Sequence, residues 1–127
     1  MSFDIFLRSF SAGESSSVDA SAVKSVLDAH VAATDDGWAR IQTTDGGAEL
    51  FGYDTLEDGF MITHTVGSAI WDLLVTVASI QPLAITPVGC PTCVTDRSML
   101  VDLPPEIAGG ALVISTGAEL LQVIKQG

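Results

Sequence analysis

Two cysteines and two histidines carry the most specific chemistry in this 127-residue sequence. Cys90-Pro91-Thr92-Cys93 is a Cys-x-x-Cys turn, and such a turn lowers the pKa of one thiol when it lies beside a helix N-terminus. A short helix predicted to begin near Thr95 would supply that N-terminus. The same two thiols, with the imidazoles of His30 and His64, would complete a tetrahedral zinc site. Thiol redox chemistry and zinc binding are therefore the two site chemistries to weigh.

The surroundings of these four residues favour a simpler interpretation. The Cys-x-x-Cys spacing resembles the dithiol of thioredoxin-like proteins, which place it after the first strand and build most of the fold downstream. Here only residues 94–127 follow the motif. The histidines are isolated and fall on different predicted elements, whereas a strong zinc signal needs a second close pair of ligands. We therefore predict a structural turn whose cysteines pack as small apolar side chains, and no cofactor. A thiol-redox or zinc site at this turn is the alternative.

Acidic residues gather between positions 35 and 58. Seven of the sixteen acids of the chain fall in this segment, against a single base, Arg40. Three aromatic residues, Trp38, Phe51 and Tyr53, are interleaved with them, and Phe60 follows. Acids on hairpin turns with aromatic neighbours are typical of a surface that docks a basic protein. The predicted docking residues are Asp35, Asp36, Trp38, Asp45, Glu49, Tyr53, Asp54, Glu57 and Asp58. The alternative is an ordinary set of solvated turns.

The composition bounds the partners. Sixteen acids and five bases give a net charge of −11, which disfavours nucleic acid and anionic membrane because both would be repelled. Apolar residues make up 47% and charged residues 17%, which argues against disorder and leaves apolar surface for a partner or a second copy to cover. Residues 1–10 lack the pattern of a signal peptide, and two cysteines imply no disulfide framework, so the cytoplasm is expected. No catalytic motif such as Gly-x-Ser-x-Gly or His-Glu-x-x-His is present, so we expect binding rather than catalysis.

The longest apolar segment predicts a central helix over residues 69–80, with Ser68 as its cap. One apolar face is made by residues at helical spacing, Ile70, Leu73, Leu74 and Val77. A second face is made by Trp71, Val75 and Ala78. Asp72, Thr76 and Ser79 form a narrow polar stripe. A helix of this kind is buried on most sides. Asp72, Gln81 and Pro82 interrupt the run of about 20 apolar residues that a membrane span would need.

The remaining elements follow from periodicity and turn signals. Phe3, Ile5 and Leu7 alternate with Asp4, Phe6 and Arg8, which predicts a strand over residues 2–10. Asp19 is predicted to cap a helix from Ala20 to about Val31, with His30 on its inward side. Further strands are expected at residues 38–43, 48–53, 60–65, 83–86 and 111–115. A short helix over 95–103 is stopped by Pro104-Pro105, and Thr116-Gly117-Ala118-Glu119 is a capping box that opens the last helix.

This order of elements predicts one α+β domain over residues 1–127. It would hold a single mixed or antiparallel sheet with helices packed mainly on one face, and a ferredoxin-like core with C-terminal additions. The strand at 83–86 lies between Pro82 and Pro87 and is expected at a sheet edge.

The opening residues Met-Ser-Phe-Asp-Ile-Phe-Leu resemble the first strand of small, mostly uncharacterised bacterial single-domain proteins. Some such acidic proteins act as immunity partners of secreted toxins. The resemblance implies a small acidic non-catalytic binding module, immunity- or inhibitor-like, that engages a basic protein. It carries no catalytic residue onto this chain. A homodimer is compatible with this function.

Overall fold

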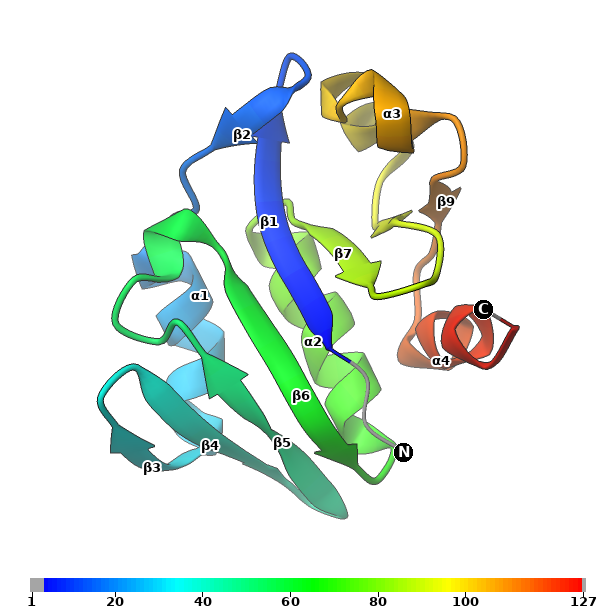
Figure 1. Cartoon of the computed structure of the whole chain (residues 1–127). Helices are drawn as coiled ribbons and strands as arrows, with labels where there is room; N and C mark the ends of the chain where they lie inside the picture. The colour runs from blue at the N-terminus through cyan, green and yellow to red at the C-terminus, as the bar shows by residue number, and fades with distance from the viewer. Residues whose placement is uncertain (1–3, 127) are drawn as a thin grey trace.

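The computed structural model describes residues 4–126, which form one mostly antiparallel open sheet with several helices (Figure 1). The strands are β1 (Ile5–Ser11), β2 (Glu14–Ser16), β3 (Val31–Asp35), β4 (Trp38–Thr43), β5 (Gly46–Phe51), β6 (Phe60–Val66), β7 (Ala84–Pro87), β8 (Cys93–Val94) and β9 (Leu112–Val113). The helices are α1 (Ala20–Leu27), α2 (Ala69–Ile80), α3 (Pro105–Ala108) and α4 (Gly117–Gln126), with 3-10 turns η1 (Asp28–His30), η2 (Leu56–Asp58) and η3 (Arg97–Asp102). The predicted α+β class is confirmed.

The strand order is β3-β4-β5-β6-β1-β7-β8-β9, with β2 paired to β1. Strand β1 is antiparallel to both β6 and β7, so those two run parallel to each other. Helix α2 joins them across β1, which makes one split β-α-β unit. Strand β3 is also parallel to β1, but β6, β5 and β4 lie between them. The predicted ferredoxin-like core, which needs two split units, is therefore not confirmed.

Helix α2 has the predicted bounds and the predicted burial. All seven residues of its two apolar faces are buried, and the polar stripe of Asp72, Thr76 and Ser79 is exposed. The helix is apolar on most sides because it contacts β5 on one side, α1 on another and α4 on a third. Figure 1 shows α1 and α2 behind the same face of the sheet, while α3 lies near the end of β1 and α4 lies beside α2. The predicted packing of the helices mainly on one face is not confirmed.

The cap of α2 differs from the prediction. The Ser68 side chain does not cap the helix; a carboxylate from the β4–β5 turn does. The Asp45 oxygens accept hydrogen bonds from the backbone N–H groups of Ser68 (2.8 Å) and Ala69 (3.2 Å) and from the Ser68 hydroxyl (2.9 Å). These bonds, led by the one from the Ser68 backbone, lower the pKa of Asp45 to about 2. Asp45 therefore ties the tip of the hairpin to the helix.

Two other elements depart from the prediction. The helix that begins after the Asp19 cap ends at Leu27 rather than Val31, and residues 31–35 form the unpredicted edge strand β3, which pairs with β4. Strand β7 is not at an edge, because it pairs with both β1 and β8. Its prolines, Pro82 and Pro87, lie before the strand and at its last residue, where a missing N–H disturbs the ladder least.

Other local predictions hold. The predicted Thr116 cap is confirmed, because its hydroxyl accepts from the Glu119 N–H at 3.1 Å. The Glu119 carboxylate reaches back to the N–H of Ser115, one residue before the cap, at 3.0 Å. Ile5 and Leu7 are buried as predicted, while Phe3 lies outside the described residues. No helix within residues 4–126 is both long enough and apolar enough to cross a membrane.

Candidate functional site

The sheet face opposite α1 and α2 carries a row of four large side chains. Phe6 of β1 lies directly opposite Met61 of β6, Met61 opposite Phe51 of β5, and Phe51 opposite Trp38 of β4. Their chain neighbours Leu7, Ile62, Leu50 and Ala39 are buried. Because side chains alternate between faces along a strand, the row points away from the helices. Phe6 is 37% exposed and Phe51 is 42% exposed, so the row is accessible to a partner.

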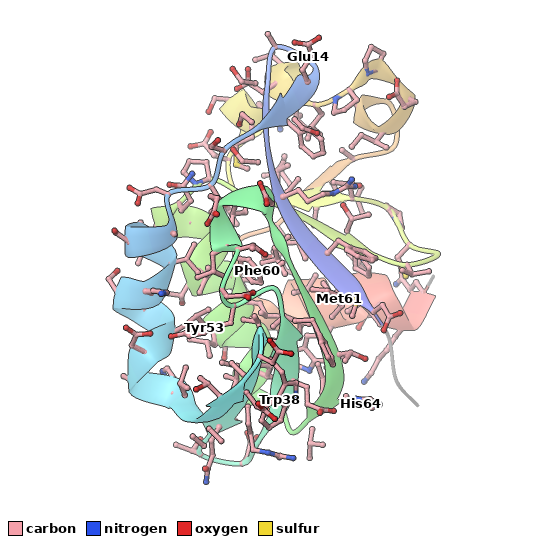
Figure 2. All side chains as sticks on the ribbon, turned by 60° about the vertical axis from the view of Figure 1, so that its left-hand side comes forward. Glu14, Trp38, Tyr53, Phe60, Met61 and His64 are labelled. Carbon is pink, nitrogen blue, oxygen red and sulfur yellow. The ribbon has the colours of Figure 1, made fainter. Side chains whose placement is uncertain are left out.

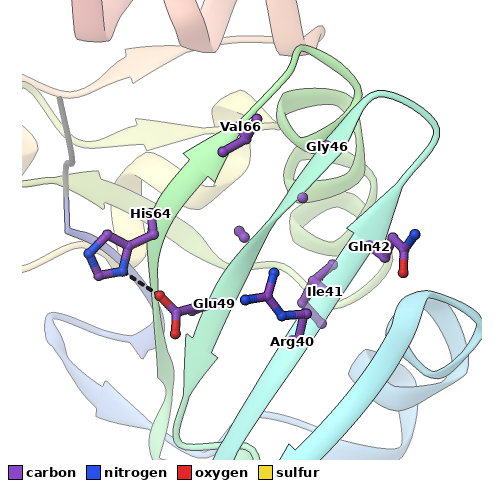
Figure 3. A pocket seen from close by; sticks show the side chains of 9 residues that line it. Arg40, Ile41, Gln42, Gly46, Glu49, His64 and Val66 are labelled. Atoms are coloured by element: carbon purple, nitrogen blue, oxygen red, sulfur yellow. Dashed lines mark ion pairs between the residues drawn. The ribbon is translucent and has the colours of Figure 1, made fainter.

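A hydrogen-bonded group borders the row on its β4–β5–β6 side. The indole Nε1–H of Trp38 donates to Oε1 of Glu49 at 2.9 Å, and Nδ1 of His64 lies 2.5 Å from Oε2 of the same carboxylate (Figure 3). The Trp38 bond first, and the bond and charge of His64 after it, lower the pKa of Glu49. An ionised carboxylate only accepts hydrogen bonds, so Nδ1 of His64 carries the shared proton. Glu49 thus holds both the indole and the imidazole in place.

A β-bulge brings His64 to Glu49. Gly47 pairs with Val66 and Glu49 pairs with Thr63, so the two residues 64–65 of β6 oppose the single Ala48 of β5. His64 takes a left-handed conformation, with φ of +52°. That conformation is uncommon for a residue other than glycine, and here it accompanies an exposed side chain, 60% accessible, that is aimed at a neighbouring strand.

Two hollows flank the row. The first, of about 470 Å³, is lined by Arg40, Gln42, Gly47, Glu49, His64 and Val66 among others. The lining position Gly47 must be glycine, because a Cβ there would lie 2.0 Å from the backbone oxygen of Ile41. The second hollow, of about 340 Å³, lies next to Phe6, Phe51 and Met61, and is also lined by Arg8 and Asp58.

The nine predicted docking residues do not form one patch. Asp35 lies opposite Trp38 across β3 and β4, and Glu49 is bonded to Trp38. Asp36 and Asp54 are exposed near the β3–β4 turn, where Gly37 accepts backbone hydrogen bonds from Gly52 and Tyr53. Exposed Glu57 and Asp58 belong to η2. Asp45 lies at the opposite end of the hairpin, a strand length of about 20 Å away, in the cap of α2.

Tyr53 belongs to the α1 side of the molecule (Figure 2). Its hydroxyl donates to the Asp28 carboxylate, and the Lys24 ammonium lies 5.1 Å from its ring centroid. Burial, with the Asp28 hydrogen bond and charge, raises the pKa of Tyr53 to about 12. This side chain therefore ties the loop after β5 to α1.

The cysteines flank the end of the exposed turn after β7, and only one of them is buried. Cys93 is fully buried in β8 opposite Ile85, and Cys90 is partly buried in the loop after β7; both thiols are free. Burial, and to a lesser extent the neighbouring Cys90, raises the pKa of Cys93 to about 11. The attacking thiol of a redox pair needs the opposite shift, so Cys93 is unsuited to that role. The predicted helix that would have lowered it is instead the 3-10 turn η3, which begins at Arg97.

The four residues of the predicted zinc set lie on separate parts of the fold. His30 is in η1, where its Nδ1 lies 3.2 Å from the backbone oxygen of Gln42, and His64 contacts Glu49. The cysteines are on β8 and the loop before it. In the part of the chain that the structure describes, no three His, Cys, Asp or Glu side chains are grouped so as to hold a metal ion.

Sequence reasoning missed Phe6 and Met61 as candidate binding residues. The alternation of residues 3–8 placed Phe6 on the side away from the core, but nothing local gave the register that aligns it with three other strands. The chain matches no protein-family model, no curated protein and no solved structure. Its function must therefore be argued from the geometry of the open sheet face.

Proposed function

We propose that this chain is a non-catalytic protein-binding module whose open sheet face docks a basic protein. The row of Phe6, Met61, Phe51 and Trp38 carries the proposal, because it places three aromatic rings and a thioether side by side on an uncovered sheet. Aromatic residues and methionine are the residues that interfaces enrich, and a few such anchors supply most of the binding energy.

The net negative charge of the chain favours a basic partner. Three acids border the row, with Asp35 at one end and Glu49 and Asp58 along its flanks. Two bases, Arg8 and Arg40, also border it. A second copy seated on this face would bring two net charges of −11 together, whereas a basic protein would be attracted to it. Charge complementarity of this kind speeds association and suppresses wrong partners. We therefore choose a basic protein over a homodimer.

In this proposal the docking surface contains only some of residues 35–58, and it also contains residues from outside that segment. Trp38, Glu49 and Asp35 belong to it, together with Phe6 and Met61 from outside the segment. Asp45 and Tyr53 are assigned to internal contacts. An immunity- or inhibitor-like action would follow if the partner's own working surface is the one that meets the row. The raised pKa of Cys93 gives the thiol alternative no support.

The proposal is tested with the partner captured by the chain from its native host. Phe51→Ala should weaken binding of that purified partner by roughly 30-fold or more, since an interface anchor contributes about 2 kcal/mol. Ile80→Ala is the matched control, because Ile80 is 54% exposed on α2, on the other side of the sheet. The association rate should fall as salt rises. Equal affinity of Phe51→Ala and wild type, or recovery of an acidic partner or of a second copy of the chain, would overturn the proposal.

A further inference from the structure

Within residues 4–126, Tyr53 is an aromatic ring that is both fixed by a carboxylate and covered by a cation. At Tyr53 the polar edge of the ring donates to a carboxylate, Asp28, and a cation, the Lys24 ammonium, lies over the ring at 5.1 Å from its centroid. The carboxylate fixes the ring and supplies the counter-charge, and the ring face supplies the quadrupole that attracts the cation. The three side chains come from α1, η1 and the loop after β5.

Trp38 repeats this arrangement without the cation. Its polar edge donates to the Glu49 carboxylate at 2.9 Å, and His64 holds the other oxygen of that carboxylate. A second carboxylate, Asp35, lies directly opposite Trp38 on the edge strand β3. Two cations of the described residues lie over aromatic rings, Arg8 over Phe10 and Lys24 over Tyr53, and none lies over Trp38.

The position of Trp38 suits an incoming side chain. It ends the exposed row and is partly exposed, and its ring is fixed by a hydrogen bond, so little side-chain freedom is lost when a partner binds. An indole is the best of the aromatic rings at attracting a cation. Glu49 accepts two hydrogen bonds, and a carboxylate has about four acceptor positions, so it can still accept from a guanidinium or ammonium.

We propose that Trp38 receives a lysine or arginine side chain of the docked partner, with the cation over the indole and Glu49 and Asp35 as its counter-charges. This rests on the proposed function, because it names the chemistry of the group that a basic partner would place at this end of the row. Glu49 is the positioning residue for the indole, and His64 is the positioning residue for Glu49.

The proposal is tested on the whole chain with a small probe, so that no partner is needed. N-acetyl-arginine N-methylamide is titrated into ¹⁵N-labelled protein, and the citrulline analogue, equal in shape but uncharged, is the matched control. The indole N–H signal of Trp38 should shift saturably with the arginine probe, with a dissociation constant on the order of 10 mM, and several-fold less with citrulline. The buried Trp71 indole is the internal control. Trp38→Leu should abolish the shifts of the Asp35 and Glu49 amides, whereas Phe51→Leu should keep them.

The outcomes separate this proposal from the previous one. An unmoved Trp38 signal, an equal response to citrulline, or unchanged Asp35 and Glu49 shifts in Trp38→Leu would each refute the cation site. If the cation site fails while Phe51→Ala still weakens the natural partner, the docking face stands without it. If the probe saturates at Trp38 but Phe51→Ala leaves partner binding unchanged, the cation site stands and the docking function falls.

Discussion

Replacing Gly117 by alanine should destabilise the protein, although helix propensity alone predicts the opposite sign. Gly117 is the first residue of α4 and is buried against α2. A Cβ at this position would lie 2.4 Å from both the backbone nitrogen and Oδ1 of Asp72, and 2.6 Å from the carbonyl carbon of Trp71. Two of these atoms are backbone atoms of a buried helix, which cannot rotate aside. Helix α4 would therefore have to move away from α2.

The size of the effect follows from three contributions. Overpacking of this kind costs about 1–3 kcal/mol. The shift would also weaken the hydrogen bond from the Gly117 N–H to Asp72 Oδ1, now 3.0 Å long, which contributes about 0.5–1.5 kcal/mol. The higher helix propensity of alanine returns at most about 1 kcal/mol. The net loss should be about 1–3 kcal/mol in the free energy of unfolding.

Urea denaturation followed by tryptophan fluorescence measures this directly, with Gly109→Ala as the matched control. Gly109 has a helical conformation, φ −65° and ψ −27°, and a Cβ there would meet nothing within 4 Å. That substitution should be neutral or should stabilise by about 0.4–1 kcal/mol, because it restricts the unfolded chain. If Gly117→Ala were as stable as wild type, the close approach of α4 to α2 would be wrong.

Three further predictions concern the core and the titrating groups. Leu74→Ala should lower the free energy of unfolding by about 2–5 kcal/mol, because Leu74 is 1% exposed in the central cluster; an unchanged urea midpoint would remove α2 from the core. Asp45 has a pKa of about 2 against 3.8 unperturbed, so its stabilising effect is full above about pH 3.8 and is lost as the pH falls toward 2. Asp45→Asn should therefore lower the urea midpoint at pH 7 and reduce the loss of stability between pH 3.8 and 2, whereas Asp58→Asn should do neither. Tyr53, the single tyrosine, has a pKa raised to about 12 from 10.0, so its stabilising effect is full below about pH 10 and is lost as the pH rises toward 12. Ultraviolet titration should show ionisation near pH 12, and Tyr53→Phe should remove this loss of stability at high pH.

Sequence patterns predicted the elements that are determined by residues close together in the sequence. The bounds and buried faces of α2, the bounds of β4, the Asp19 cap and the Thr116 cap all depend on residues within a few positions of one another, and all are confirmed. The failures have distant causes. The cap of α2 comes from Asp45, 23 residues before Ser68, and β7 lies inside the sheet because β1 and β8 approach it from both sides. Strand β3 is not predicted, and only its first residue, Val31, falls in the predicted helix, because the pairing of β3 with β4 has no local signal.

The open face of the sheet illustrates the same division. Alternation along each strand predicts which residues share a face, and it placed Phe6 away from the core correctly. Alternation does not give register, and a shift of one residue in any strand would send its member of the row to the helix side. The bulge at residues 64–65 depends on register too, because it exists only where β6 meets β5. The alignment of Phe6, Met61, Phe51 and Trp38, and the contact between Glu49 and His64, are therefore consequences of pairing among four strands. A candidate site on such a face can be recognised only after those strands are placed, whereas the acids that surround it are visible in the sequence from the start.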